Sequence, residues 1–158
     1  MTKQITYIQA RTATEFEIAK KLTLAYSKTL NLDLSFQNFQ EEIASLDTRY
    51  NGPKGALLIA EIDGQPAGVV AVHEFSEGVA ELKRLYVDPN FRQFGLGAEL
   101  VERIIAIATD KGYQRIRLDT LPTMTGAQKI YRALGFHAIE AYRYNPVVGT
   151  LFLEKTLA

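Results

Sequence analysis

The sequence predicts a single α/β domain of the α+β type, with a mixed, mostly antiparallel central sheet of about seven strands and about four helices. Short alternating apolar segments are interspersed with longer segments whose apolar residues recur every three or four positions, the spacing of an amphipathic helix. Two pairs of strand-like segments are joined by Asp-Gly and Glu-Gly turns, which are typical of hairpins. A length of 158 residues with 47% hydrophobic content suits one core, so residues 1–158 are expected to form one domain.

The N-terminal third is predicted to hold one strand and two helices. Residues 5–9 alternate as a strand does, and Thr12 with Glu15 then forms a capping box in front of a helix over about 13–30. Ser35 is the candidate cap of a shorter second helix, whose apolar positions are Phe36, Phe39, Ile43 and Leu46.

Three antiparallel strands are predicted for the middle of the chain, because apolar runs flank the turns Asp63-Gly64 and Glu77-Gly78. The third run leads into an amphipathic helix after Gly97. The remaining predicted elements are a strand over 115–119, a helix from about 125 to Gly135, and two last strands near 136–142 and 149–155.

The turn between the third strand of this group and the helix is the most informative feature of the chain. Gly95 and Gly97 let the backbone approach a ligand closely, and the first N–H groups of the helix carry the positive end of its dipole. The segment therefore predicts an anion site such as one for a pyrophosphate. It is not a P-loop, because Ala98 and Glu99 follow Gly97, and Leu100 replaces the last glycine of a dinucleotide fingerprint.

What remains is an R-x-x-G-x-G pattern that follows an L-x-V-x-P strand end. With Arg92, Gly95 and Gly97 after Leu85, Val87 and Pro89, it resembles the acyl-CoA-binding core of the GNAT superfamily of N-acyltransferases. The resemblance continues to the C-terminal strand through Ala127-x-x-x-Tyr131-x-x-x-Gly135-Phe136. It implies that strands four and five run parallel and splay apart, which leaves the edge of strand four open to the amides of a pantetheine arm.

The resemblance also implies that acetyl-CoA binds as a co-substrate along strand four and the glycine turn. The residues expected to contact it are Leu85, Tyr86, Val87, Arg92, Gln93, Phe94, Gly95, Leu96, Gly97 and Ala98. Met124 stands where many members of the family have Asn. The amide contact of that Asn is therefore absent or is replaced by Thr123 or Thr125.

Two residues are candidate catalytic groups. Tyr131 matches the family's tyrosine and is the candidate proton donor to the CoA thiolate, since a phenol pKa near 10 exceeds a thiol pKa of about 8.5. Glu81 lies where protein-modifying members have a catalytic glutamate and is the candidate general base, directly or through water. Structural alternatives stay open, with Tyr131 as a core residue and Glu81 as an exposed strand glutamate paired with Lys83 or a neighbour. The oxyanion is expected at a backbone N–H near Leu85 or Tyr86.

Arg84 and Lys83, with Arg143, are the candidate acceptor-binding residues, because they would attract an amine that carries a carboxylate. Solvated surface charge is the alternative. Successive strand residues point to opposite faces, so Glu81 and Lys83 should share one face and Arg84 the other unless the strand bulges.

Composition excludes several classes. Eighteen basic and eighteen acidic residues leave no net charge, so neither a nucleic acid nor an anionic membrane is an expected partner. The absence of cysteine excludes disulfides and thiolate chemistry, and His73 and His137 are isolated in sequence, so no metal is expected. The N-terminus has no apolar stretch long enough for a signal peptide, and a cytoplasmic protein is expected.

These observations predict an N-acetyltransferase that moves acetyl from acetyl-CoA to the primary amine of a small molecule, such as an amino acid, by direct attack in a ternary complex. Two other functions stay open. One is acetylation of a protein N-terminus or lysine, and the other is a non-catalytic acyl-CoA-binding regulatory module on the same fold. The turn at 145–149 and the last strand are a candidate surface for a homodimer.

Overall fold

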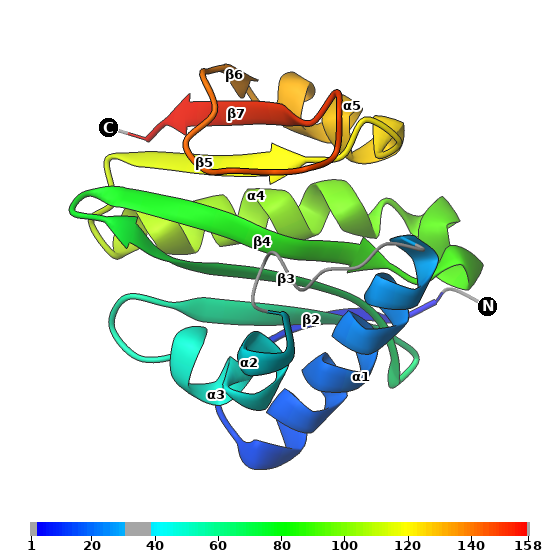
Figure 1. The fold of residues 1–158 in the computed structure, drawn as a ribbon. Helices are drawn as coiled ribbons and strands as arrows, with labels where there is room; N and C mark the ends of the chain where they lie inside the picture. The colour runs from blue at the N-terminus through cyan, green and yellow to red at the C-terminus, as the bar shows by residue number, and fades with distance from the viewer. Residues whose placement is uncertain (1–2, 31–38, 158) are drawn as a thin grey trace.

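The computed structural model describes residues 3–30 and 39–157 (Figure 1). Seven strands form one mixed sheet in the order β1-β2-β3-β4-β5-β7-β6, and only β4 and β5 are parallel neighbours among the described strands. The strands are β1 Ile5–Gln9, β2 Ala56–Ile62, β3 Gln65–Ser76, β4 Val79–Val87, β5 Arg115–Thr120, β6 His137–Ala138 and β7 Leu151–Thr156. The helices are α1 Ala13–Leu30, α2 Phe39–Ala44, α3 Leu46–Arg49, the 3₁₀ helix η2 Pro89–Phe94, α4 Leu96–Asp110 and α5 Thr125–Ala133.

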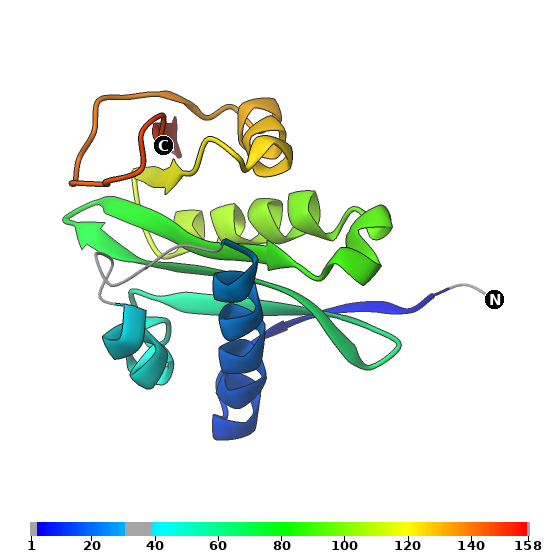
Figure 2. The ribbon, with the colours of Figure 1, turned by 45° about the vertical axis from the view of Figure 1, so that its right-hand side comes forward.

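Helices cover both faces of the sheet, as Figures 1 and 2 show. On one face α1 packs against β3 and β4, and on the other α4 crosses β2, β3 and β4 with α5 beside it. The predicted stripe of α4 is buried, with Leu100, Val101 and Ile104 fully enclosed. Each such aliphatic side chain stabilises the fold by about 1.5–3 kcal/mol. The single α/β domain predicted from the sequence is confirmed, and so is its parallel β4–β5 pair.

Local predictions at the first helix and the two hairpins are confirmed. Thr12 Oγ1 accepts the Glu15 backbone N–H at 3.2 Å, and Glu15 Oε1 accepts the Thr12 N–H at 3.0 Å, which completes the capping box. The β2–β3 and β3–β4 pairs are antiparallel across the two predicted turns.

The predicted second helix is wrong in its extent. Ser35 and Phe36 lie outside the described residues, and the rest forms α2 and α3 with a break between them at Ser45. The Ser45 hydroxyl donates to the Glu41 carbonyl at 2.8 Å, a bond from a side chain to the preceding turn that competes with continuation of the helix.

The C-terminal strands also differ from the prediction. The strand near 136–142 is only the two-residue β6, and the chain then runs irregularly from 139 to 150 before β7. Aromatic and cationic side chains in this loop turn toward the sheet. Tyr142 packs edge-on against Phe152, with ring centroids 5.3 Å apart, and this contact replaces strand pairing.

Candidate functional site

The parallel strands β4 and β5 pair over only part of their length. Their register runs from Val79 opposite Arg115 to Glu81 opposite Arg117, whereas β4 continues to Val87. Beyond Glu81, the backbone of β4 therefore has no β5 partner and its amide groups border an open wedge. Such an edge can bind an extended ligand as an added strand would.

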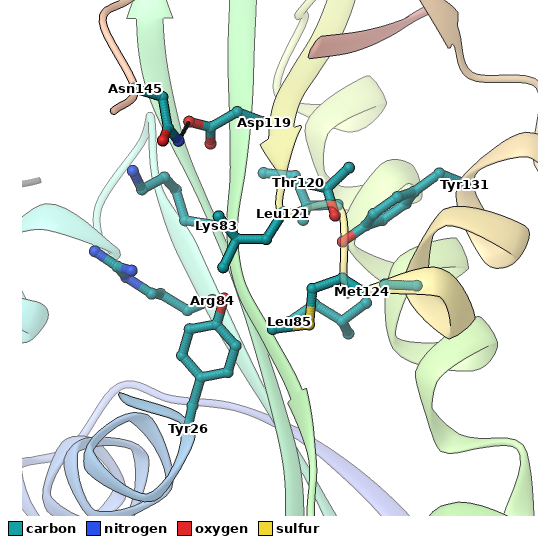
Figure 3. A pocket seen from close by; sticks show the side chains of 12 residues that line it. Tyr26, Lys83, Arg84, Leu85, Asp119, Thr120, Leu121, Met124, Tyr131 and Asn145 are labelled. Carbon is teal, nitrogen blue, oxygen red and sulfur yellow. Dashed lines mark hydrogen bonds between the residues drawn. The ribbon is translucent and has the colours of Figure 1, made fainter. Parts of the chain in front are cut away.

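A β-bulge on β4 reorients the side chains at this wedge. Val69 lies opposite Tyr86 and Ala71 opposite Lys83, so β4 has one residue more than β3 between these pairs. Arg84 takes up the extra length in the left-handed region, with φ of 62°. The bulge brings Arg84 toward α2 on the same side as Lys83, which strict alternation would forbid (Figure 3).

The first cavity is a groove of about 440 Å³ between β4 and the start of α5. Five of the ten residues predicted to contact acetyl-CoA line it: Leu85, Tyr86, Val87, Arg92 and Gly97. The opposite wall comes from residues 123–127 and 130, and Tyr26, whose ring packs edge-on against Tyr86 with centroids 5.8 Å apart, also lines the groove. Thr123 and Thr125 are thus placed with Met124 at the groove, where the sequence offered them as replacements for the missing Asn.

The other five predicted residues do not line the groove. Leu96 is fully buried in the core, and Gln93, Gly95 and Ala98 are exposed. The predicted glycine turn is the 3₁₀ helix η2, which the Asp88 carboxylate caps by accepting the Asn90 N–H at 2.8 Å. Gly95 has φ of 70°, a left-handed conformation that lets α4 begin directly after η2.

The groove suits a phosphate-bearing donor. Gly97 lies in the first turn of α4, whose unpaired N–H groups favour an anion, and Arg92 holds its guanidinium at the same end by donating to the Val87 carbonyl at 3.1 Å. A Cβ on Gly97 would be 3.0 Å from Ile130 Cδ1, which leaves little room across the groove.

Replacing Gly97 by Val should therefore weaken acetyl-CoA binding by at least about tenfold, or 1.4 kcal/mol, because the γ-methyl groups would fill the groove. Calorimetry on both proteins measures this. Ala106→Val places the same side chain on the exposed face of the same helix and should leave affinity unchanged. Equal affinity in wild type and Gly97→Val would remove this groove as the acetyl-CoA site.

A second, smaller cavity of about 50 Å³ lies where β4 and β5 part. It meets the groove, since Tyr26, Leu85, Met124 and Ala127 line both. Its other lining residues are Leu82, Lys83, Arg84, Asp119, Thr120, Leu121, Tyr131 and Asn145 (Figure 3).

Tyr131 lies at this junction. Its ring packs against Phe136, with centroids 5.5 Å apart, and only 4% of the residue is exposed, while its hydroxyl points toward the space between the strands (Figure 3). Burial, with smaller contributions from Tyr26 and Asp119, raises the pKa of Tyr131 well above its usual value. The phenol therefore stays protonated at neutral pH. From the sequence, Tyr131 was interpreted either as the proton donor or as a core residue. Its ring lies in the core and its hydroxyl borders the cavity, so this position is compatible with both interpretations.

The two predicted acceptor-binding cations have different surroundings. Arg84 Nε donates to Glu42 Oε2 at 2.5 Å, and both side chains are almost fully buried. Burial alone would raise the pKa of Glu42, but the hydrogen bond and charge of Arg84 lower it. Lys83 forms no ion pair with the described residues, and burial lowers the pKa of its ammonium. Lys83 thus lines the cavity as a buried cation outside any ion pair of the described residues, while the ion pair of Arg84 with Glu42 links the bulge to α2.

Glu81 lies beside the cavity but is enclosed. His73 Nε2 lies 2.8 Å from Oε1, and Tyr142 and Arg143 both donate to Oε2. Burial alone would raise its pKa, but the His73 hydrogen bond and the charges of Lys83 and Arg143 lower it to about 2. A carboxylate so weakly basic and so fully engaged is a poor proton acceptor, so these contacts argue against the role of general base. They make Glu81 an anchor for the loop over 139–150.

Sequence reasoning did not single out Tyr26, Glu42, Asp119 or Asn145. The sequence indicated only that Asp119 is a polar residue near the end of a predicted strand. Asn145 reaches the cavity because its loop folds back over the sheet, and Glu42 binds Arg84 because α2 lies over the bulge. In the described residues, no group of three or more His, Asp and Glu side chains could hold a metal ion, and no helix is long and apolar enough to cross a membrane.

Comparisons with known proteins agree with this geometry. The profile of the Acetyltransferase (GNAT) family matches residues 24–136. An uncharacterized N-acetyltransferase from Schizosaccharomyces pombe is 38% identical over 88% of this chain and 86% of its own length. The N-acetylaspartate synthetase of Homo sapiens is 30% identical over 73% of this chain, but the match spans 39% of that protein. A GNAT family acetyltransferase from Elizabethkingia anophelis, solved with acetyl-CoA bound, has the same fold with a TM-score of 0.70 at 20% identity, over 97% of this chain and 98% of that chain.

Proposed function

Because this chain belongs to the Acetyltransferase (GNAT) family and is an N-acetyltransferase, we propose that it transfers the acetyl group of acetyl-CoA to the primary amine of a small acceptor that carries a carboxylate, such as an amino acid. The observation that carries the proposal is the position of Lys83, a buried cation in the lining of a small cavity that opens on the donor groove. The relatives named N-acetyltransferases favour an enzyme over the non-catalytic acyl-CoA-binding alternative.

The donor is acetyl-CoA, which supplies an activated thioester. Its pantetheine arm would lie along the unpaired edge of β4, and its pyrophosphate at Arg92 and the first turn of α4. This arrangement directs the thioester to the junction of the groove and the cavity. The structural relative with acetyl-CoA bound supports the same choice of donor.

The reaction would proceed by direct attack of the amine nitrogen on the thioester carbonyl carbon. The oxyanion that forms would be stabilised by backbone N–H groups of β4 near Leu85 or Tyr86, which the splay leaves without β5 partners. Cleavage of the carbon–sulfur bond releases the thiolate, and the Tyr131 hydroxyl lies at the junction to protonate it. No covalent enzyme intermediate is required.

The acceptor class follows from charge. Lys83 is buried and forms no direct ion pair with the described residues, and the charge of Glu81 only partly offsets the effect of burial on the pKa of its ammonium. A carboxylate on the acceptor would therefore stabilise the charged form of Lys83 further. The relative named N-acetylaspartate synthetase is consistent with an amino acid acceptor.

Replacing Lys83 by Gln tests the acceptor class. We expect KM for an amino acid to rise about tenfold or more, the value of one charged hydrogen bond, whereas KM for the corresponding amino acid amide stays unchanged. The assay detects the free thiol of CoA with paired acceptors that differ only in the carboxylate. Lys21→Gln, at an exposed position of α1, is the matched control.

Two results would contradict the proposal. Equal effects of Lys83→Gln on the acid and the amide would show that the ammonium does not bind the carboxylate. A wild-type enzyme that acetylates peptides but no free amino acid would assign it to a protein acceptor, the second function left open by the sequence.

A further inference from the structure

Asp119 is a carboxylate in the acceptor cavity to which no role has yet been assigned. It lies on β5 between the buried residues Leu118 and Thr120, where the strand has parted from β4. Among the described residues it accepts one hydrogen bond, from Asn145 Nδ2 to Oδ2 at 3.4 Å, and has no ion-pair partner (Figure 3). At 3.4 Å this hydrogen bond is long, and it leaves most of the carboxylate's capacity to accept hydrogen bonds unused.

The other carboxylates near the cavity are already neutralised. Glu42 is paired with Arg84, Glu81 with His73 and Arg143, and Glu154 with Arg117. Asp119 therefore differs from them in lacking a cation within the described part of the chain. A half-buried carboxylate without a cation is complementary to an ammonium group.

The charge of Asp119 acts on the same space as the proposed acid. It raises the pKa of Tyr26 and of Tyr131, both of which line the cavity, after the larger effect of burial. The titratable and charged groups that face Asp119 come from four elements: Tyr26 of α1, Lys83 and Arg84 of β4, Tyr131 of α5, and Tyr142 of the loop over 139–150. The cavity thus has a cationic pole at Lys83 and an anionic pole at Asp119.

Resting on the proposed function, we infer that Asp119 is the catalytic residue that receives the acceptor's amino group, binding it as an ammonium and taking its proton during transfer. The ammonium first loses one proton to solvent and becomes a neutral nucleophile. As nitrogen bonds to the thioester carbon, its second proton passes to Asp119, and the carbon–sulfur bond breaks as the thiolate takes the Tyr131 proton. Asp119 and Tyr131 then return to their starting states through water, so each turnover releases one proton.

Asp119→Asn tests this inference, because Asn keeps the size of the side chain and removes its charge. With the amino acid found for the wild type, kcat/KM at pH 7 should fall about 10²-fold, as for loss of a general base. The defect should persist as pH approaches the pKa of the amine, because a higher pH removes only the first proton, whereas the proton that Asp119 receives leaves the nitrogen during attack. Acetyl-CoA affinity by calorimetry and the melting temperature should not change. Asp119→Glu should recover part of the activity, and Asp110→Asn, at an exposed end of α4, should match the wild type.

The failures of the two proposals are distinguishable. If the wild type acetylates no carboxylate-bearing amine, the proposed function fails before Asp119 is tested. If the wild type is active and Asp119→Asn stays within about threefold of it at every pH, Asp119 does not receive the amine. A higher KM with unchanged kcat would likewise overturn the proton transfer, since Asp119 would then only bind the acceptor.

Discussion

Replacing Glu81 by Gln is expected to lower the free energy of unfolding by about 3 kcal/mol at pH 7. The fall in its pKa from 4.5 to about 2 corresponds to this energy, and truncating one partner of a buried ion pair costs a similar amount. Gln retains the volume but leaves Arg143 and His73 facing a neutral amide. Urea unfolding measures the change, and for a domain of this size the melting temperature should fall by about 10 °C.

The same contribution of Glu81 makes the stability of the wild type depend on pH. A carboxylate whose pKa is depressed in the fold stabilises it above the unfolded pKa and loses that contribution as pH falls through the folded pKa. The stability of the wild type should therefore decline between about pH 4.5 and pH 2 and approach that of Glu81→Gln. Glu74→Gln is the control. Glu74 lies on neighbouring β3 and forms an exposed ion pair with Lys54, so its replacement should lower the free energy of unfolding by less than about 1 kcal/mol. Equal stability of Glu81→Gln and wild type at pH 7 would contradict the anchoring role.

Replacing Tyr131 by Phe is expected to lower kcat about 10²-fold, the low end for loss of a general acid. The ring and its contact with Phe136 remain, so acetyl-CoA affinity and stability should change little. Because burial raises the pKa of Tyr131, its ionisation should give no basic limb in the rate profile of the wild type below about pH 10. Single-turnover measurement of thiol release isolates the chemical step.

Tyr144→Phe is the matched control, since that residue is 77% exposed on the loop over 139–150. It removes a phenol of the same kind from outside both cavities. If kcat of Tyr131→Phe stays within about twofold of wild type while chemistry limits the rate, Tyr131 is a core residue and the thiolate takes its proton from water.

The fold was largely readable from the sequence because its signals are local. The Thr12–Glu15 capping box and the two Gly-containing hairpin turns each set one boundary with a few residues. The break at Ser45 depends on one side-chain bond, and the irregular loop over 139–150 on contacts with distant strands. Such tertiary contacts leave no periodic pattern, which is why the last strand but one was predicted too long.

The site was predictable where the backbone does the binding. Along the donor groove, the strand end, the glycines and the start of the helix follow one another at a fixed spacing in the sequence. Half of the residues that this spacing predicted to contact acetyl-CoA line the groove. The acceptor side depends on which charges meet in space. From the sequence, Glu81 was the candidate general base or a strand glutamate paired with Lys83 or a neighbour. In the structure His73 and Arg143 bind it, while Asp119 has no ion-pair partner among the described residues. Sequence alone cannot show which carboxylate has found a partner.

The splay of β4 from β5 separates two kinds of recognition along one strand. Along the edge of β4, the donor would bind main-chain groups, which amino-acid substitutions leave largely unchanged. The acceptor would instead contact side chains from β4, β5 and the loop over 139–150. Acceptor preference is therefore free to diverge under mutation while donor preference is conserved. A library that varies Lys83 and Asn145 and keeps Asp119 should yield enzymes with new acceptors that still consume acetyl-CoA.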